Sequence, residues 1–212
     1  MNISSDMMLK VCGMRDAQNM VDVAAQHPDL MGFIFYPGSP RFVGDAFEIP
    51  VNFPAHVGRV GVFVLESTDK IRELAKRHGL QFIQLHGGES VAQCAALKQH
   101  HLKVIKVFLI GEDFDFNEVR EFVPVADYFL FDTKSKTYGG SGITFDWSIL
   151  DRYSYDIPFF LSGGLTSQNC DKALALQHSK LAGLDFNSGL EKSPGIKDPA
   201  KVKEVYELMH HH

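Results

Sequence analysis

Residues 158–176 read PFFLSGGLTSQNCDKALAL, and this stretch contains one complete β-α unit. The apolar run at its start is short and typical of a buried parallel strand. Two glycines follow the run, and residues 167–176 then have the pattern of a helix. A strand that leads into a helix is the building block of parallel α/β folds, so the number of such units decides the architecture.

Short apolar runs of the same kind recur along the whole chain. They lie at Leu9–Cys12, Met31–Phe35, Arg59–Phe63, Phe82–Leu85, Val104–Phe108, Tyr128–Asp132, Pro158–Ser162 and Gly183–Phe186. Eight strands alternating with helices predict a closed (β/α)8 TIM barrel of the α/β class. An open doubly wound sheet is the alternative, because periodicity alone does not distinguish the two.

Helical patterns fall between most of these strands. They cover Asp16–Gln26, Asp69–His78, Glu89–Gln99, Ser167–Leu176 and Asp198–Met209. Asp16 is a good N-cap residue, Gly79 is a stop signal, and Pro199 stands where a helix tolerates proline. Gly44–Pro54 has two prolines and little helical period, and Phe145–Leu150 allows one or two turns.

Size and composition are those of one ordinary globular domain. The chain has 212 residues, of which 45% are apolar and 22% charged. We find no linker or low-complexity stretch, so residues 1–209 are expected to form a single barrel domain. The terminal His210-His211-His212 is interpreted as the remnant of a purification tag.

Charge and cysteine content restrict the partners and the compartment. A net charge of −5 argues against nucleic acid and anionic membrane, although backbone N–H groups can still bind an anionic substrate. Cys12, Cys94 and Cys170 form neither a disulfide framework nor a zinc pattern, and free thiols suit the cytoplasm. We find no signal peptide and no membrane-spanning run.

Chemically distinctive residues stand at the predicted strand ends, where enzymes with this barrel have their active sites. Cys12, followed by Gly13, is a candidate base or nucleophile, and otherwise a small buried hydrophobe. As a base it is expected to have a lowered pKa. Asp132 follows an apolar strand, where desolvation favours a protonated general acid. Its alternative role is to cap the next loop.

Four further side chains have more than one open interpretation. Arg41, in a loop stiffened by Pro37 and Pro40, suits a bidentate carboxylate but could be a solvated surface residue. His86 is a base, a metal ligand or a hydrogen-bonded structural histidine, and we see no second ligand at metal spacing. Lys10 and Lys106 either face the barrel interior and pair with a residue such as Asp185, or face the helices.

Glycine-rich loops follow the last two strands. Gly163-Gly164 precedes a helix that begins at Ser167, and Ser188-Gly189 follows the eighth strand. Backbone N–H groups in such loops bind phosphate, and this pair of loops is the usual phosphate site of the barrel. The polar, glycine-containing segment Lys134–Gly142 is expected to be a mobile lid.

Taken together, these motifs resemble the phosphoribosylanthranilate isomerases of tryptophan biosynthesis. The resemblance spans nearly the whole chain, through Lys10-Val11-Cys12-Gly13-Met14-Arg15, Gly32-Phe33-Ile34-Phe35, Ser39-Pro40-Arg41-Phe42-Val43, Gly61-Val62-Phe63-Val64, Gln84-Leu85-His86-Gly87, Gly139-Gly140-Ser141-Gly142, Phe145-Asp146-Trp147, Leu161-Ser162-Gly163-Gly164-Leu165, Asp185-Phe186-Asn187-Ser188-Gly189-Leu190-Glu191 and Gly195-Ile196-Lys197-Asp198. Asn187 stands where the family more often has serine.

The resemblance implies a cofactor-free, metal-free Amadori rearrangement of N-(5-phosphoribosyl)anthranilate to 1-(o-carboxyphenylamino)-1-deoxyribulose 5-phosphate. It implies that Cys12 is the general base, that Asp132 is the general acid and that Arg41 binds the anthranilate carboxylate. His86 is placed among the substrate-binding residues, with the phosphate held by Gly163, Gly164, Ser188 and Gly189. A monomer or homodimer in the cytoplasm is expected.

Two other functions remain open at this point. A phosphosugar lyase such as indole-glycerol-phosphate synthase would share the phosphate loops but would need a catalytic lysine at a strand end. A non-catalytic phosphate-binding module would also keep those loops, but it would have no use for Cys12 and Asp132.

Overall fold

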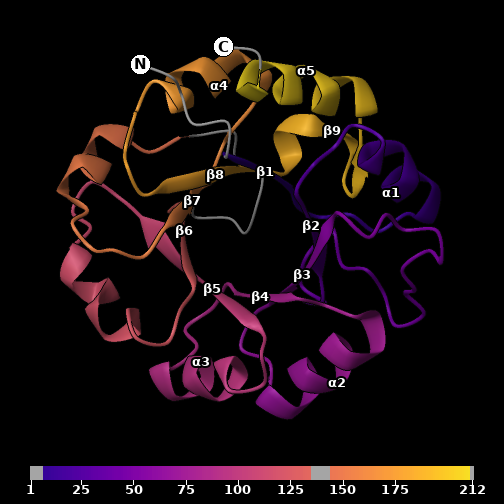
Figure 1. Cartoon of the computed structure of the whole chain (residues 1–212), viewed down its shortest axis with the longest axis horizontal. Coiled ribbons are helices and arrows are strands. Elements are labelled where there is room, and N and C mark those ends of the chain that lie inside the picture. Colours follow the sequence, from indigo (N-terminus) through magenta and orange to yellow (C-terminus); the bar gives the residue numbers. More distant parts are fainter. Residues whose placement is uncertain (1–6, 135–143, 211–212) are drawn as a thin grey trace.

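The computed structural model describes residues 7–134 and 144–210, and its eight parallel strands close into a barrel (Figure 1). The last strand pairs with the first, with Lys10 opposite Asp185. The TIM-barrel prediction is therefore confirmed, and the open sheet is excluded. The strands are β1 Met8–Val11, β2 Leu30–Ile34, β3 Gly58–Phe63, β4 Phe82–Leu85, β5 Lys103–Ile110, β6 Tyr128–Thr133, β7 Phe159–Leu161 and β8 Leu181–Phe186.

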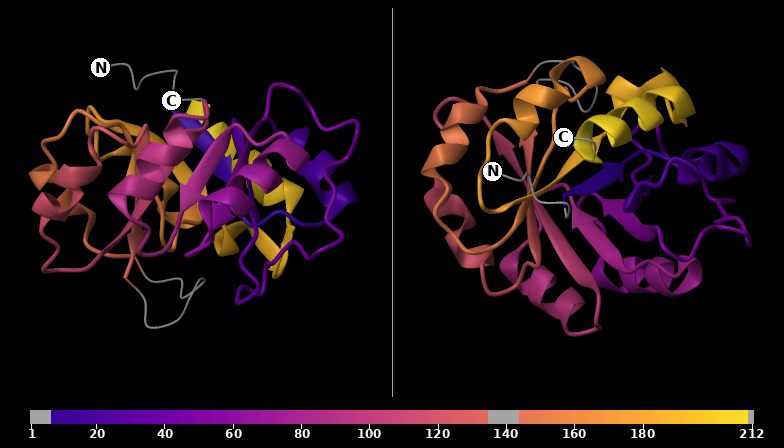
Figure 2. Two further views of the ribbon diagram at one scale, coloured as in Figure 1. Left: turned by 90° about the horizontal axis from the view of Figure 1, so that it is seen from below. Right: turned by 45° about the horizontal axis from the view of Figure 1, so that its top comes forward.

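Helices surround the barrel as an outer ring (Figures 1 and 2). The α-helices are α1 Ala17–Ala24, α2 Thr68–His78, α3 Val91–Lys98, α4 Ser167–Leu174 and α5 Pro199–His210. Shorter 3-10 helices are η1 Phe116–Phe122, η2 Trp147–Arg152 and η3 Ser188–Leu190. η1 lies in a stretch that has no distinct helical pattern. η2 overlaps the weak pattern at Phe145–Leu150.

Local sequence signals explain where several helices begin and end. The Asp16 side chain accepts a hydrogen bond from the Asn19 N–H at 2.8 Å, which caps α1. Gly79 ends α2 in the left-handed conformation, with φ of 59°. Pro199 is the first residue of α5, as expected.

The connection between β2 and β3 contains no helix, which agrees with the weak pattern of Gly44–Pro54. Two aromatic rings of this connection instead cover β2. The rings of Phe47 and Phe53 lie 5.4 and 6.1 Å from that of Phe33. This packing buries the outer face of the strand where a helix would otherwise lie.

The apolar core has two layers, because successive residues of a strand point to opposite faces. The larger layer lies between the strands and the helices. The smaller one fills the barrel interior with Leu30, Val60, Ile105, Val107, Leu130 and Phe160. The interior is therefore closed by packed side chains below the rim that carries the strand ends.

A further element was also not expected from the sequence. A small antiparallel hairpin follows β8, formed by β9 Glu191–Ser193 and β10 Ile196–Lys197.

Among the described residues no helix is long and apolar enough to cross a membrane. The predicted lid at Lys134–Gly142 lies, apart from its first residue, outside the described residues.

Candidate active site

The residues singled out from the sequence gather at one end of the barrel. Cys12 and His86 directly follow β1 and β4, and Asp132 lies near the end of β6. Arg41 lies in the connection after β2. Because all eight strands are parallel, these positions share the C-terminal rim, where catalysis occurs in this fold.

Cys12 lies just inside this rim, and its residue is 4% exposed. Its backbone N–H donates to the Phe186 carbonyl at 2.8 Å, which continues the pairing of β1 with β8. On the other side, Gly32 of β2 makes room for the thiol. A Cβ atom at Gly32 would lie 2.7 Å from the Cys12 Sγ, so a larger residue there would displace the sulfur.

The electrostatic environment of Cys12 has two opposing parts. Burial raises the pKa of the thiol above its ordinary value, and the neighbouring Asp185 adds to this effect. The ammonium groups of Lys10 and Lys197 lower the pKa but do not outweigh the desolvation. The expectation of a lowered Cys12 pKa is therefore wrong, because the sequence does not reveal how completely the thiol is buried.

The sequence did not decide whether Lys10 and Lys106 face the barrel interior or the helices, and in the structure they face opposite sides of the barrel wall. Lys10 points into the barrel and donates to Asp185 at 2.7 Å. Lys106 faces the outer layer, where it pairs with the buried Glu89 at 2.8 Å and lies over the Phe122 ring. Lys10 thus belongs to the surroundings of Cys12, whereas Lys106 holds the loop after β4.

Asp132 and His86 lie side by side on the rim. The Oδ2 atom of Asp132 is 3.4 Å from the Nε2 atom of His86, and both side chains are about a quarter exposed. Asp132 also accepts the Thr133 N–H at 2.8 Å through its Oδ1 atom. On its far side, the Nδ1 atom of His86 lies 3.0 Å from the Gln84 amide. The imidazole is thereby oriented so that Nε2 faces the carboxyl group.

Arg41 is buried, and its guanidinium already has a carboxylate partner within the chain. Its Nε and Nη2 atoms donate to the two carboxylate oxygens of Glu191 at 2.8 and 2.7 Å. The interpretation of Arg41 as a solvated surface residue is therefore excluded. A bidentate carboxylate was expected at this arginine, but Glu191 was not expected to supply one.

Glu191 and Lys197 are the residues of this region that sequence reasoning missed. They lie on the two strands of the β9–β10 hairpin, and their side chains are 7% and 0% exposed. The Lys197 ammonium lies 2.6 Å from Glu191 and 2.7 Å from the Asn187 side chain. The Pro194-Gly195 turn between two opposite charges was the signal that could have indicated a charged hairpin.

The two glycine-bearing loops lie against each other and against Asp132. Gly163 and Gly164 have φ values of 91° and 69°, which favour glycine. A Cβ atom at Gly163 would lie 2.7 Å from the Asp132 Oδ1, and one at Gly189 would collide with the Leu165 carbonyl. The loop after β7 thus connects the N-terminus of α4 to the side of the rim that carries Asp132.

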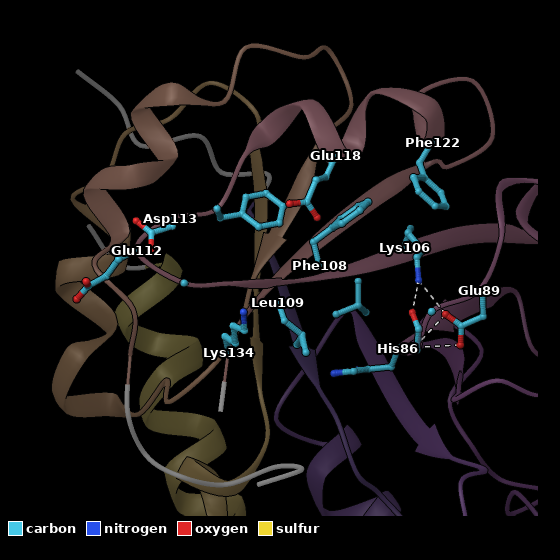
Figure 3. Close-up of a pocket in the computed structure, with 15 residues that line it drawn as sticks. His86, Glu89, Lys106, Phe108, Leu109, Glu112, Asp113, Glu118, Phe122 and Lys134 are labelled. Atoms are coloured by element: carbon cyan, nitrogen blue, oxygen red, sulfur yellow. Dashed lines mark hydrogen bonds and ion pairs between the residues drawn. The ribbon is translucent and has the colours of Figure 1, made fainter. Parts of the chain in front are cut away.

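A cavity of about 870 Å³ opens beside His86, between the loop after β4 and the connection from β5 to η1 (Figure 3). Phe108 and Leu109 leave β5 on opposite sides, so the cavity extends over the end of this strand. Leu109 is 43% exposed although it is apolar. The described residues contain no group of three or more side chains suited to a metal ion.

Comparisons with known proteins show which family the chain belongs to. Residues 9–208 match the family model of N-(5'-phosphoribosyl)anthranilate (PRA) isomerase. The isomerase of Phocaeicola vulgatus is 45% identical over 92% of this chain and 94% of its own. That of Parabacteroides distasonis is 42% identical over 96% of this chain and 94% of its own.

Solved structures of such isomerases have the same fold. The Thermotoga maritima enzyme superposes with a TM-score of 0.82 at 32% identity, over 97% of this chain and all of that one. An isomerase solved with reduced 1-(o-carboxyphenylamino)-1-deoxyribulose 5-phosphate gives 0.79 at 28% identity, with the same coverage. The chain therefore belongs to the N-(5'-phosphoribosyl)anthranilate isomerase family, the isomerases of tryptophan biosynthesis.

Proposed function

We propose that this isomerase converts N-(5-phosphoribosyl)anthranilate into 1-(o-carboxyphenylamino)-1-deoxyribulose 5-phosphate, with Asp132 as general acid and Cys12 as general base. The observation that carries the assignment is the position of these two groups. Asp132 lies near the end of β6 and Cys12 directly follows β1, so both stand on one rim. Below them the interior is packed with apolar side chains and the Lys10–Asp185 ion pair. A related isomerase binds the reduced form of this product, which supports the choice of substrate.

The first step opens the sugar ring. Protonated Asp132 gives its proton to the furanose oxygen, the C1–O bond breaks, and the nitrogen lone pair forms a C1=N bond. His86, with Nε2 3.4 Å from the carboxyl group, is placed to orient Asp132 and to contact the released hydroxyl. A positioned acid of this kind contributes roughly 10²- to 10⁴-fold to the rate.

The second step moves a proton from carbon. The C1=N bond acidifies the hydrogen on C2, and the Cys12 thiolate accepts it while the electron pair forms C1=C2 and neutralises the nitrogen. The enol at C2 then becomes the ketone as C1 gains a proton. Lys10 and Lys197 favour the thiolate, so they oppose the cost of forming a charged sulfur in a buried place.

The remaining residues bind the two ends of the substrate. Arg41 takes the anthranilate carboxylate. The backbone N–H groups of Gly163, Gly164, Ser188 and Gly189 bind the phosphate, beside the first turn of α4. The positive φ values at Gly163 and Gly164 support this role, because glycine adopts them without strain and leaves no side chain between the backbone and an anion.

Compartment and assembly are also proposed. The cysteines Cys12, Cys94 and Cys170 are free and buried, which suits the reducing cytoplasm. The Thermotoga maritima isomerase has been studied as a dimer and as monomers generated from it. We propose a monomer or homodimer for this chain.

The test is the conversion of chemically generated phosphoribosylanthranilate, followed by the loss of its fluorescence. Asp132→Asn should lower kcat by about 10²- to 10⁴-fold and change KM much less, because asparagine keeps the shape but has no proton to give. Asp127→Asn is the matched control. Asp127 precedes the same strand and also accepts a backbone N–H, from Val104 at 2.8 Å, but at the opposite end.

The control should retain kcat within about threefold, since it removes a similar carboxylate away from the rim. A kcat of Asp132→Asn close to that of the unmodified enzyme would remove Asp132 from the acid role. An equal loss in both variants would show that the effect comes from the fold and not from the proton.

A further inference from the structure

Arg41 is held by a carboxylate of its own chain, in a geometry that leaves part of its donor set unused. Glu191 accepts from Nε and Nη2 of Arg41 at 2.8 and 2.7 Å, and both side chains are 7% exposed. A guanidinium has five N–H donors. Two belong to this pair, and the other three, on the edges turned away from Glu191, have no hydrogen-bond partner among the described residues.

Glu191 is in turn fixed from the other side. Its Oε1 atom accepts from the Lys197 ammonium at 2.6 Å and from the Gly195 N–H at 2.9 Å. Burial alone would raise the pKa of the Glu191 carboxyl, but Arg41, followed by Lys197 and the Gly195 N–H, holds it at about 2, so the group is ionised at neutral pH. The carboxylate therefore has little freedom to follow Arg41 if the arginine moves.

The charges of this cluster do not cancel. Arg41 and Lys197 are two cations beside one anion, and all three side chains are buried. An excess positive charge in a buried place is costly unless an anion approaches it. One carboxylate, such as that on an anthranilate ring, brings the cluster to neutrality.

The cluster also lies next to the base. A Cβ atom at Gly13 would be 2.8 Å from the Arg41 Cδ, 2.7 Å from the Asn187 Oδ1 and 3.3 Å from the Lys197 Nζ. Gly13 directly follows Cys12, so the excess charge borders the position where proton transfer from C2 would occur. The carboxylate of the substrate is on the aromatic ring, which is joined through the amine nitrogen to C1, the neighbour of C2.

We infer, on the basis of the proposed role of Arg41, that Glu191 is a positioning residue for the substrate carboxylate. It fixes one edge of the Arg41 guanidinium so that the other edge faces the rim. Lys197 keeps Glu191 charged and in place. Glu191 and Lys197 thereby align the aromatic ring of the substrate relative to Cys12 through Arg41, without themselves touching the substrate.

The experiment compares two substrates in a double-mutant cycle. One substrate is phosphoribosylanthranilate, and the other is the adduct of aniline and ribose 5-phosphate, which lacks the carboxylate. Glu191→Gln keeps the size of the side chain but loses the charge and one of the two acceptors for Arg41. It should raise KM for the carboxylate substrate about ten- to a hundredfold, with kcat changed less than about threefold.

Two results distinguish positioning from a general structural effect. With the aniline adduct, KM should be the same for Glu191→Gln and for the unmodified enzyme within about twofold. In an Arg41→Ala background, Glu191→Gln should raise KM no further, because both changes remove one interaction. Glu48→Gln is the matched control, since Glu48 pairs with Arg77 at 2.7 Å on the exposed surface. It should leave both substrates unaffected.

Equal losses on both substrates, or additive losses with Arg41→Ala, would overturn the positioning role of Glu191. The proposed role of Arg41 fails separately, if Arg41→Ala weakens both substrates equally. If Glu191→Gln does not fold, the same measurements are made on Glu191→Asp. It keeps the charge but shortens the reach, so a smaller rise of KM confined to the carboxylate substrate is expected, and an equal rise on both contradicts the inference.

Discussion

The Lys10 ammonium lies 2.7 Å from the Oδ2 atom of Asp185, inside the barrel and on neighbouring strands. Their side chains are 0% and 4% exposed, so water does not screen the pair. Lys10 also lowers the pKa of Cys12, which lies two residues further along the chain, just after β1. The pair therefore joins the stability of the barrel interior to the chemistry at its rim.

Removing one member of the pair should destabilise the protein strongly. Lys10→Met leaves the Asp185 carboxylate buried without its cation, which costs about 3–5 kcal/mol in comparable cases. Lys10→Met combined with Asp185→Leu should recover much of this loss. The free energies of unfolding, measured with urea at neutral pH, give both values.

Activity should respond differently from stability in these variants. The double variant loses the ammonium beside Cys12, so its kcat should stay low even though its stability returns. If kcat recovers together with stability, Lys10 supports the fold and has no part in the function of Cys12.

The three cysteines should differ in their reaction with iodoacetamide. Burial raises the pKa of Cys94 to about 11 and that of Cys170 to about 12, and it also raises the pKa of Cys12. Lys10 and Lys197 oppose the effect at Cys12, which is also the one at the rim. Cys12 should therefore be alkylated first, although more slowly than a free thiol.

Mass spectrometry of partly modified protein at several pH values ranks the three sites. The rate at Cys12 should rise about tenfold for each pH unit between 7 and 9, because alkylation requires the thiolate. A rate at Cys12 that does not change with pH, or a faster reaction at Cys94, would contradict this description of the site.

Stability at low pH should depend on Glu191. Its folded pKa of about 2 lies below the ordinary value of 4.5, so its contribution is complete above pH 4.5 and is lost as the pH falls toward 2. Relative to Glu191→Gln, the unmodified protein should lose up to about 3 kcal/mol of unfolding free energy over this range. Urea unfolding at pH 6, 4 and 3 measures the difference, and a constant difference would show that Glu191 is not stabilised as a carboxylate.

Most of the fold could be predicted from the sequence, because the strands are continuous apolar runs between glycine-bearing loops. The bounds of β4 agree with the sequence, and those of the other strands differ by one or two residues. The hairpin formed by Glu191–Ser193 and Ile196–Lys197 was missed. Its strands are two and three residues long and charged, so neither apolar period nor length indicates them.

The sequence was sufficient to predict which residues belong to the candidate site, but not which residues they contact. Cys12, Asp132 and Arg41 could be selected because each has an unusual side chain at a strand end or in the following loop. Their partners lie far away along the chain, as with Arg41 and Glu191, which are separated by 150 residues. The pKa of Cys12 depends on such contacts and on burial, so its direction required the structure.

The assignment of Cys12 as the general base is tested most directly by the turnover of Cys12→Ala. Alanine keeps the buried, apolar character of the position but cannot accept a proton. We expect kcat to fall by about 10²- to 10⁴-fold, while the affinity for reduced 1-(o-carboxyphenylamino)-1-deoxyribulose 5-phosphate changes less than about threefold. Cys94→Ala and Cys170→Ala, in α3 and α4, are controls that should keep kcat. A Cys12→Ala enzyme that turns over at the rate of these controls would contradict the general-base role, and Cys12 would then be a packed core residue.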